Sequence, residues 1–152
     1  MITQRAGRER EEAGAVGELG HHDCVALVAA PHHERTALVW VEGWRPLPLA
    51  CFVSYQGDVL IPTGENPLLA DTVCGRAVTV EFLDRGGEWV VRGTGTARPL
   101  TREDLPPRVP SAATEPAMLH ASRYGIHVHV SRFSGTRSPA APDSAVLHGG
   151  HA

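Results

Sequence analysis

Five short apolar runs separated by glycine-containing turns constrain this 152-residue chain more than any other feature. Between residues 36 and 100 they read TALVWV, RPLPLACFVSY, VLIPT, RAVTVEFL and EWVVRGTGTARPL. Each run is rich in Val, Leu or aromatic residues, as strands are. Asp84-Arg85-Gly86-Gly87, between the last two runs, is the clearest hairpin turn in the sequence. The pattern predicts an antiparallel β-meander.

A further strand is predicted near the end of the chain, in GIHVHVSRF. Ile126, Val128 and Val130 alternate with His127, His129 and Ser131, as expected for a half-buried strand. Five or six such strands favour a closed or partly closed barrel, because closure removes exposed sheet edges. The predicted fold class is therefore mainly β (α+β), with short peripheral helices.

Helices are predicted before and between the strands. Asp23 is a candidate N-cap for a short helix that ends at Pro31, although a buried strand is a competing interpretation. ENPLLADTVCG, residues 65–75, looks like a single helical turn over the sheet. Residues 101–125 are rich in Pro and Ala, and predict one or two short helices or a long excursion rather than a central strand.

The domain organisation follows from these patterns. Residues 1–20 are predicted to form a charged N-terminal arm or helix, and residues 21–133 a single barrel domain. Residues 134–152 contain mainly Ser, Pro, Ala, Gly and His, with little to bury, so a disordered C-terminal tail is expected.

Composition excludes several classes of protein. The net charge is -3, all 14 basic residues are Arg, and no Arg block could follow a nucleic-acid backbone. The three cysteines form no CxxC motif and are interpreted as reduced thiols. No apolar run approaches the length of a membrane span or a signal-peptide core. We therefore expect a cytoplasmic protein that binds neither nucleic acid nor membranes.

The order of these elements resembles the pyridoxamine 5'-phosphate oxidase-like, FMN-binding split barrel family over residues 22–137. The motifs that carry the resemblance are a short helix and strand, an Arg-Pro strand whose hairpin partner ends in Thr-Gly, the segment VVRGTGTARPL, and a final strand, IHVHVSRFSGTR. The resemblance implies a six-stranded antiparallel split β-barrel that pairs into a homodimer, with flavin sites in the clefts between subunits.

It also implies which residues meet the cofactor. The flavin ring would lie against the backbone of the strand that begins at Arg45, and the phosphate would be held by that strand and the loop that follows the next one. The cofactor-binding residues expected on this basis are Arg45, Pro48, Leu49, Ala50, Thr63, Gly64 and Asn66, together with Arg76 as a cation that could compensate for missing ones.

The sequence departs from the family pattern at the phosphate. The strand Lys position falls on Ala50, the loop cations fall on residues 67–69 (Pro-Leu-Leu), and Glu65 adds a negative charge. A dianion needs charge-assisted donors, so these losses weaken FMN binding unless another cation substitutes. Arg76, Arg92 and Arg132 are candidates, with ordinary strand-edge arginines as the competing interpretation.

Other chemistry-bearing residues leave alternatives open. His127 and His129 share a strand face and could hold one ion, but no third ligand is identifiable, so no metal site is assigned and the competing interpretation is two surface imidazoles. A haem would need one axial ligand, for which His32 or His33 is the candidate. Cys51 and Cys74 lie in apolar runs and are interpreted as core residues rather than nucleophiles.

The hypothesis that follows is an FMN-dependent oxidoreductase acting on a small organic substrate, with no catalytic residue assigned. One alternative is a split barrel that has lost the flavin phosphate site. It would act as a cofactor-independent biosynthetic enzyme or bind a small molecule. A haem-dependent enzyme at the same cleft is a further alternative.

Overall fold

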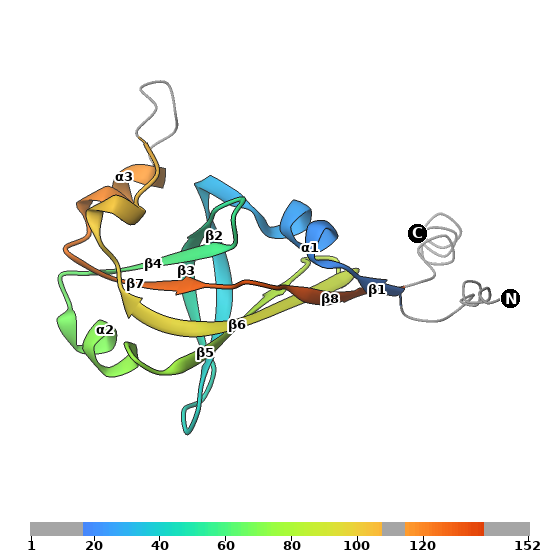
Figure 1. Cartoon of the computed structure of the whole chain (residues 1–152), viewed down its shortest axis with the longest axis horizontal. Coiled ribbons are helices and arrows are strands. Elements are labelled where there is room, and N and C mark those ends of the chain that lie inside the picture. The colour runs from blue at the N-terminus through green and yellow to red at the C-terminus, as the bar shows by residue number, and fades with distance from the viewer. Residues whose placement is uncertain (1–16, 108–114, 139–152) are drawn as a thin grey trace, which may run out of the picture.

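The computed structural model describes residues 17–107 and 115–138, with side chains in the second range described from residue 118. Its centre is a six-stranded antiparallel barrel made of β2 (Ala30–Val41), β3 (Leu47–Val53), β4 (Asp58–Gly64), β5 (Ala77–Leu83), β6 (Trp89–Pro99) and β7 (Tyr124–His129). The strands follow one another around the barrel as β5-β2-β3-β4-β7-β6, and pairing of β6 with both β5 and β7 closes the ring (Figure 1). The predicted mainly β barrel is confirmed.

Two short strands extend the sheet beyond the barrel. β1 (Gly17–Leu19) pairs with β8 (Ser134–Arg137), which pairs in turn with the first half of β6 (Figure 1). Residues 17–19 and 134–137 are thus strands, where the sequence analysis expected a charged arm or helix and a disordered tail, and most of both expected segments lies outside the described residues. Gly135 shows why composition misleads, since a Cβ there would lie 2.5 Å from the Val90 carbonyl oxygen. Gly135 allows the backbones of β8 and β6 to pair closely, and a glycine gives no hydrophobic pattern from which a strand could be predicted.

Alternation along the strands builds the core. The barrel interior takes one face of every strand, including Val39 of β2, Val80 of β5 and Val128 of β7. Phe133, just before β8, joins this core and lies edge-on to Phe82, their ring centroids 6.4 Å apart. A second, smaller cluster lies outside the barrel, where Phe52, Leu60 and Leu119 pack together.

Within residues 17–107 and 115–138, four helical segments lie around the barrel: α1 (His21–Val28), α2 (Pro67–Val73), the 3₁₀ helix η3 (Arg102–Asp104) and α3 (Glu115–Ala121). Helix α1 is present as predicted, but its N-cap is Gly20 and not Asp23, which lies in the first turn. Helix α2 follows the loop after β4, where Asn66 is the N-cap and accepts a hydrogen bond from the Leu68 amide at 2.9 Å. In the described ranges, no helix has the length and apolar character to cross a bilayer.

Candidate functional site

A cavity of about 370 Å³ lies where the outer face of β3 meets the end of β4. Ala50 of β3 and Pro62, Gly64 and Glu65 at the end of β4 form one side of it, and Met118, Ala121 and Ser122, in and after α3, form the other. We call it the Gly64 cavity. It brings together the strand and the loop from which the resemblance expects a flavin site.

The loop at Gly64 is fixed by the segment that follows α3. The Ser122 hydroxyl accepts a hydrogen bond from the Gly64 amide at 2.7 Å and donates to the Tyr124 carbonyl at 2.7 Å. The Arg123 amide donates to the Gly64 carbonyl at 3.1 Å. Gly64 has φ of 67°, a left-handed conformation that favours glycine. The cavity edge is therefore held by backbone conformation and by a residue pair far away in sequence.

The other polar loop residues are engaged within the loop itself. The Thr63 hydroxyl donates to the Asn66 carbonyl at 3.3 Å, and the Asn66 side chain caps α2. These contacts order the loop and leave its outer surface to Glu65 and the 70% exposed Leu68.

The eight residues expected at the cofactor fall into three groups. Ala50 and Gly64 line the cavity, with Thr63 and Asn66 in the adjoining loop. Arg45 and Pro48 are exposed in and after the turn from β2 to β3, whereas Leu49 packs against the barrel core. Arg76 lies elsewhere: its guanidinium donates to the Glu42 carbonyl at 3.1 Å and stacks 5.9 Å from the Trp44 ring centroid.

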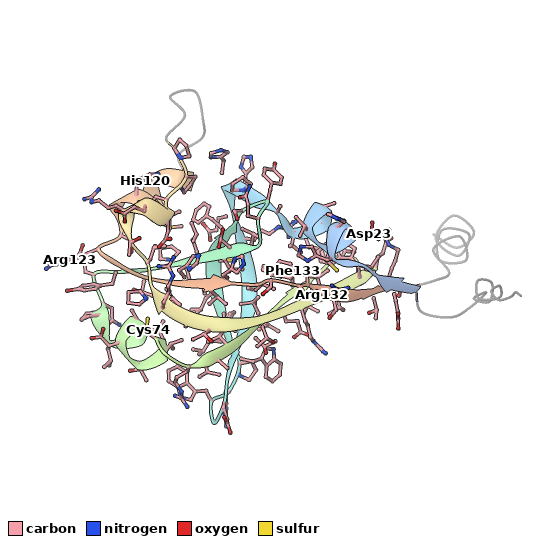
Figure 2. All side chains as sticks on the ribbon, in the orientation of Figure 1. Asp23, Cys74, His120, Arg123, Arg132 and Phe133 are labelled. Carbon is pink, nitrogen blue, oxygen red and sulfur yellow. The ribbon has the colours of Figure 1, made fainter. Side chains whose placement is uncertain are left out.

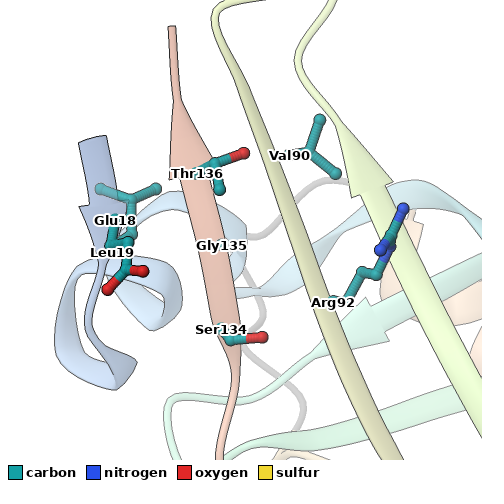
Figure 3. A pocket seen from close by; sticks show the side chains of 7 residues that line it. All are labelled: Glu18, Leu19, Val90, Arg92, Ser134, Gly135 and Thr136. Carbon is teal, nitrogen blue, oxygen red and sulfur yellow. The ribbon is translucent and has the colours of Figure 1, made fainter. Parts of the chain in front are cut away.

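The two other candidate cations also lie away from the loop. Arg92 pairs with Glu81 at 2.8 Å on the outer face of β5 and β6. Arg132 lies beside Phe133 toward β8 and away from Arg123 (Figure 2). Arg92 also borders a separate cavity of about 460 Å³ over β1, β6 and β8 (Figure 3), which shares no lining residue with the Gly64 cavity.

Ser122 and Arg123 are the residues that the sequence analysis missed. Arg123 is exposed, its backbone touches Gly64, and its guanidinium carbon lies 5.4 Å from the Tyr124 ring centroid. The antiparallel pairing of β4 with β7 sets Gly64 opposite Tyr124 and so brings Ser122 and Arg123 to the loop. No local sequence pattern predicts that pairing.

The composition of the cavity fits the ring of a flavin better than its phosphate. Ala50, Pro62 and Met118 give it apolar walls, and β3 offers a strand backbone at its edge. Arg123 contacts the loop through its backbone, but its guanidinium lies over the Tyr124 ring, and the residue lines a neighbouring cavity rather than this one. A phosphate here would therefore need the exposed Arg123 side chain to turn toward it, and Glu65 in the lining would repel it.

The candidate metal, haem and thiol residues lie apart from this cavity. His32 borders another cavity, and His33 is exposed, so neither proposed haem ligand is in the Gly64 lining. Burial raises the pKa of Cys51 to about 12, which fits its interpretation as a core residue. Burial, with a smaller contribution from Asp71, also raises the pKa of Cys74. Both thiols are therefore mainly protonated at neutral pH, but Cys74 is partly exposed and is not the core residue that the sequence predicted.

His127 and His129 are not the two surface imidazoles that the alternating pattern suggested. His127 is only 5% exposed. Its Nε2 lies 2.8 Å from Asp58 Oδ1, and Nδ1 of the exposed His129 lies 2.9 Å from the same oxygen. Among the described residues, no group of three or more His, Cys, Asp or Glu side chains is arranged to hold a metal. The imidazoles share a carboxylate.

Comparisons with known proteins support the fold. No family model matches the sequence, and no curated protein matches it. Among solved structures, the FAD binding protein from Mycobacterium smegmatis is 20% identical, with a TM-score of 0.55 over 82% of this chain and 99% of that one. The "putative pyridoxamine 5'-phosphate oxidase" from Corynebacterium glutamicum is 16% identical, with a TM-score of 0.51 over 82% of this chain and 94% of that one. The closed ring of six strands and these two likenesses agree, and the chain has the pyridoxamine 5'-phosphate oxidase-like split-barrel fold.

Proposed function

We propose that this protein binds a flavin at the Gly64 cavity and works as a flavin-dependent oxidoreductase on a small organic substrate. The observation that carries the proposal is the meeting of Ala50, Gly64 and the Ser122-Arg123 pair at the edge of a split barrel. Two solved structures with this fold, described as an FAD binding protein and a putative pyridoxamine 5'-phosphate oxidase, support it.

In this proposal the ring lies on β3 at Ala50, where the small side chain leaves the strand backbone accessible. Arg123 supplies the cation for the phosphate, in place of the Lys that the family carries at position 50. Ser122 holds the Gly64 turn in position. A bound flavin supplies the hydride-transfer chemistry, and the chain supplies binding, orientation and exclusion of water.

The proposal includes a second copy of the chain. The outer face of β2 and β5 carries Trp40 and Leu83, which are 43% and 53% exposed. Glu81 between them is buried, accepts a hydrogen bond from the Trp40 indole at 3.2 Å and pairs with Arg92. An ordered, partly apolar sheet face of this kind suits a homodimer interface. Sedimentation of the wild type and of Trp40→Ser tests it: a monomeric wild type would refute this part.

The test of flavin binding is a titration followed by flavin fluorescence and absorbance, with riboflavin, FMN and FAD. Loss of one charge-assisted hydrogen bond costs about 1.5–3 kcal/mol, so Arg123→Ala should weaken FMN binding roughly 10- to 150-fold. Riboflavin has no phosphate, so its affinity should not change. Arg85→Ala, which removes an exposed arginine from the β5–β6 turn, is the matched control. A wild type that binds none of the three flavins refutes the proposal.

A second candidate function uses the same cavity without a flavin. Glu65 in the wall, with Pro62 and Met118 beside it, favours an apolar molecule without phosphate. The protein would then be a cofactor-independent enzyme or a small-molecule-binding protein. A folded wild type that shows no saturable binding of riboflavin, FMN or FAD would favour this candidate.

A further inference from the structure

A separate cavity of about 310 Å³ lies on the other part of the outer barrel surface, between the turn after β3 and the segment that follows η3. Its walls include Phe52, Tyr55 and Pro106, and its polar lining includes His32, Asp58 and Asp104. We call it the Tyr55 cavity. It shares no lining residue with the Gly64 cavity, and its volume is in the range of small-molecule sites, about 300–1,000 Å³.

The walls of the Tyr55 cavity are fixed by contacts on the side away from it. The Arg98 guanidinium donates to both oxygens of Asp104, at 2.7 and 3.2 Å. His120 of α3 lies 3.1 Å, Nε2 to oxygen, from the Pro106 carbonyl. Phe52 packs beneath Leu119 of the same helix. A cavity ordered before its ligand arrives loses less entropy on binding.

The charged groups in the lining are carboxylates. Neither Arg nor Lys is among the residues that line the cavity. Burial tends to raise the pKa of Asp58, but hydrogen bonds from His129 and His127 outweigh it and hold that pKa below the ordinary value. The pKa of Asp104 is lowered in the same way, by Arg98 and Thr101 against the effect of burial. Both side chains are therefore anionic at neutral pH.

The Asp58 carboxylate can accept further hydrogen bonds. Its Oδ1 lies within hydrogen-bond distance of both histidine rings, whereas its Oδ2 accepts a longer hydrogen bond, 3.2 Å, from the Ser54 hydroxyl. Each carboxylate oxygen can accept two hydrogen bonds.

Two buried imidazole nitrogens in this region have no hydrogen-bond partner within the described part of the chain: Nδ1 of His32, which lines the cavity, and Nδ1 of His127, which does not. Nδ1 of His32 can donate or accept a hydrogen bond, depending on the tautomer of the ring. The charged acceptor that the lining offers to a ligand is therefore the Asp58 carboxylate.

We propose that the Tyr55 cavity is a second ligand site, which binds a small organic ammonium ion with a short apolar or aromatic body. The ammonium group donates to Asp58 Oδ2, and the body lies between Tyr55, Phe52 and Pro106. Tyr55 is 68% exposed, so its ring is available to cover an arriving ligand and to face its charge. The chemistry is opposite to that of a flavin phosphate, so this site and the Gly64 cavity select different molecules.

The test uses three probes of similar shape and different charge: 2-phenylethylammonium, neutral 2-phenylethanol and anionic 3-phenylpropanoate. Binding is followed by the backbone amide NMR signals of residues 54–58 and 104–105. We expect saturable shifts there with the ammonium probe, at least tenfold weaker binding of the alcohol, and no shifts with the carboxylate. Equal affinity for ammonium and alcohol, or no shift at these amides at about 10 mM probe, overturns the proposal.

Variants distinguish the loss of ammonium binding at this cavity from a general effect of mutation on the protein. Asp58→Asn should weaken ammonium binding at least tenfold, and Asp71→Asn, an exposed carboxylate on α2, should leave it unchanged. Tyr55→Ala removes an exposed ring without disturbing the core, so it tests the site even if Asp58→Asn unfolds the protein, and a several-fold loss is expected. FMN titrations of Tyr55→Ala should match wild type, which makes failure of this site distinguishable from failure of flavin binding. Unchanged ammonium affinity in Tyr55→Ala refutes the proposed pose.

Discussion

Ser122→Ala tests how the Gly64 cavity is held together. The Ser122 hydroxyl is both an acceptor, for the Gly64 amide, and a donor, to the Tyr124 carbonyl, each at 2.7 Å. Its removal breaks both hydrogen bonds while changing the volume of a half-buried side chain very little. The expected loss therefore comes almost wholly from hydrogen bonding.

The size of the stability loss depends on whether water can reach the Gly64 amide and the Tyr124 carbonyl once the hydroxyl is gone. The Gly64 amide is at the surface, where water can replace the hydroxyl, so its loss belongs at the low end of the usual 0.5–1.5 kcal/mol. The Tyr124 carbonyl is partly buried, and its loss costs about 1 kcal/mol or more. Together the free energy of unfolding should fall by about 1–2 kcal/mol, which lowers Tm by roughly 4–10 °C for a domain of this size.

The assay is urea unfolding followed by tryptophan fluorescence, with calorimetry for Tm and an FMN titration on the same samples. Ser122→Thr keeps the hydroxyl and should restore most of the stability, and Ser131→Ala, at an exposed serine after β7, is the control. FMN binding should weaken in Ser122→Ala because the Gly64 turn is less well ordered. A change in unfolding free energy below about 0.3 kcal/mol in Ser122→Ala would show that the hydroxyl does not hold the turn.

Three more predictions concern the core and the ionised groups. Phe133→Ala, which empties a fully buried site beside Phe82, should cost about 3–5 kcal/mol in urea unfolding, and a loss under 1 kcal/mol would contradict its place in the core. The folded-state pKa of Asp58 is below its ordinary value of 3.8, so its stabilising contribution is present above that pH and disappears as pH falls below it. Asp58→Asn should therefore flatten the acid limb of a stability profile, which Asp71→Asn should leave intact. With its pKa raised to about 12, Cys51 should resist iodoacetamide in the native protein at pH 8 and react after unfolding, as mass spectrometry of the alkylated peptides would show.

The sequence predicts those parts of the fold that depend on residues close together in the chain. The β5–β6 hairpin follows from Asp84-Arg85-Gly86-Gly87, because a tight turn between two apolar runs leaves few other conformations. Helix α2 follows from Asn66 and Pro67, a capping residue and a proline suited to a first turn.

What the sequence does not show depends on contacts between distant segments. Ser122 and Arg123 reach Gly64 only because β7 pairs with β4, and nothing within residues 101–125 indicates that partner. His127 is polar and lies on the predicted outer face, yet it is buried because η3 and α3 pack over that side of the barrel. Alternation predicts which way a side chain points, and not what later covers it.

The position of β1 and β8 in the chain affects which part of the sheet unfolds locally first. These strands are the first and last of the described chain, so almost the whole domain lies in the loop that their contact closes. Such contacts bring the largest loop-closure entropy for only a few hydrogen bonds, and they form after the local hairpins. The β1–β8 extension should therefore exchange its amide hydrogens through local opening, well before the barrel strands exchange theirs, and the barrel remains the cooperative unit.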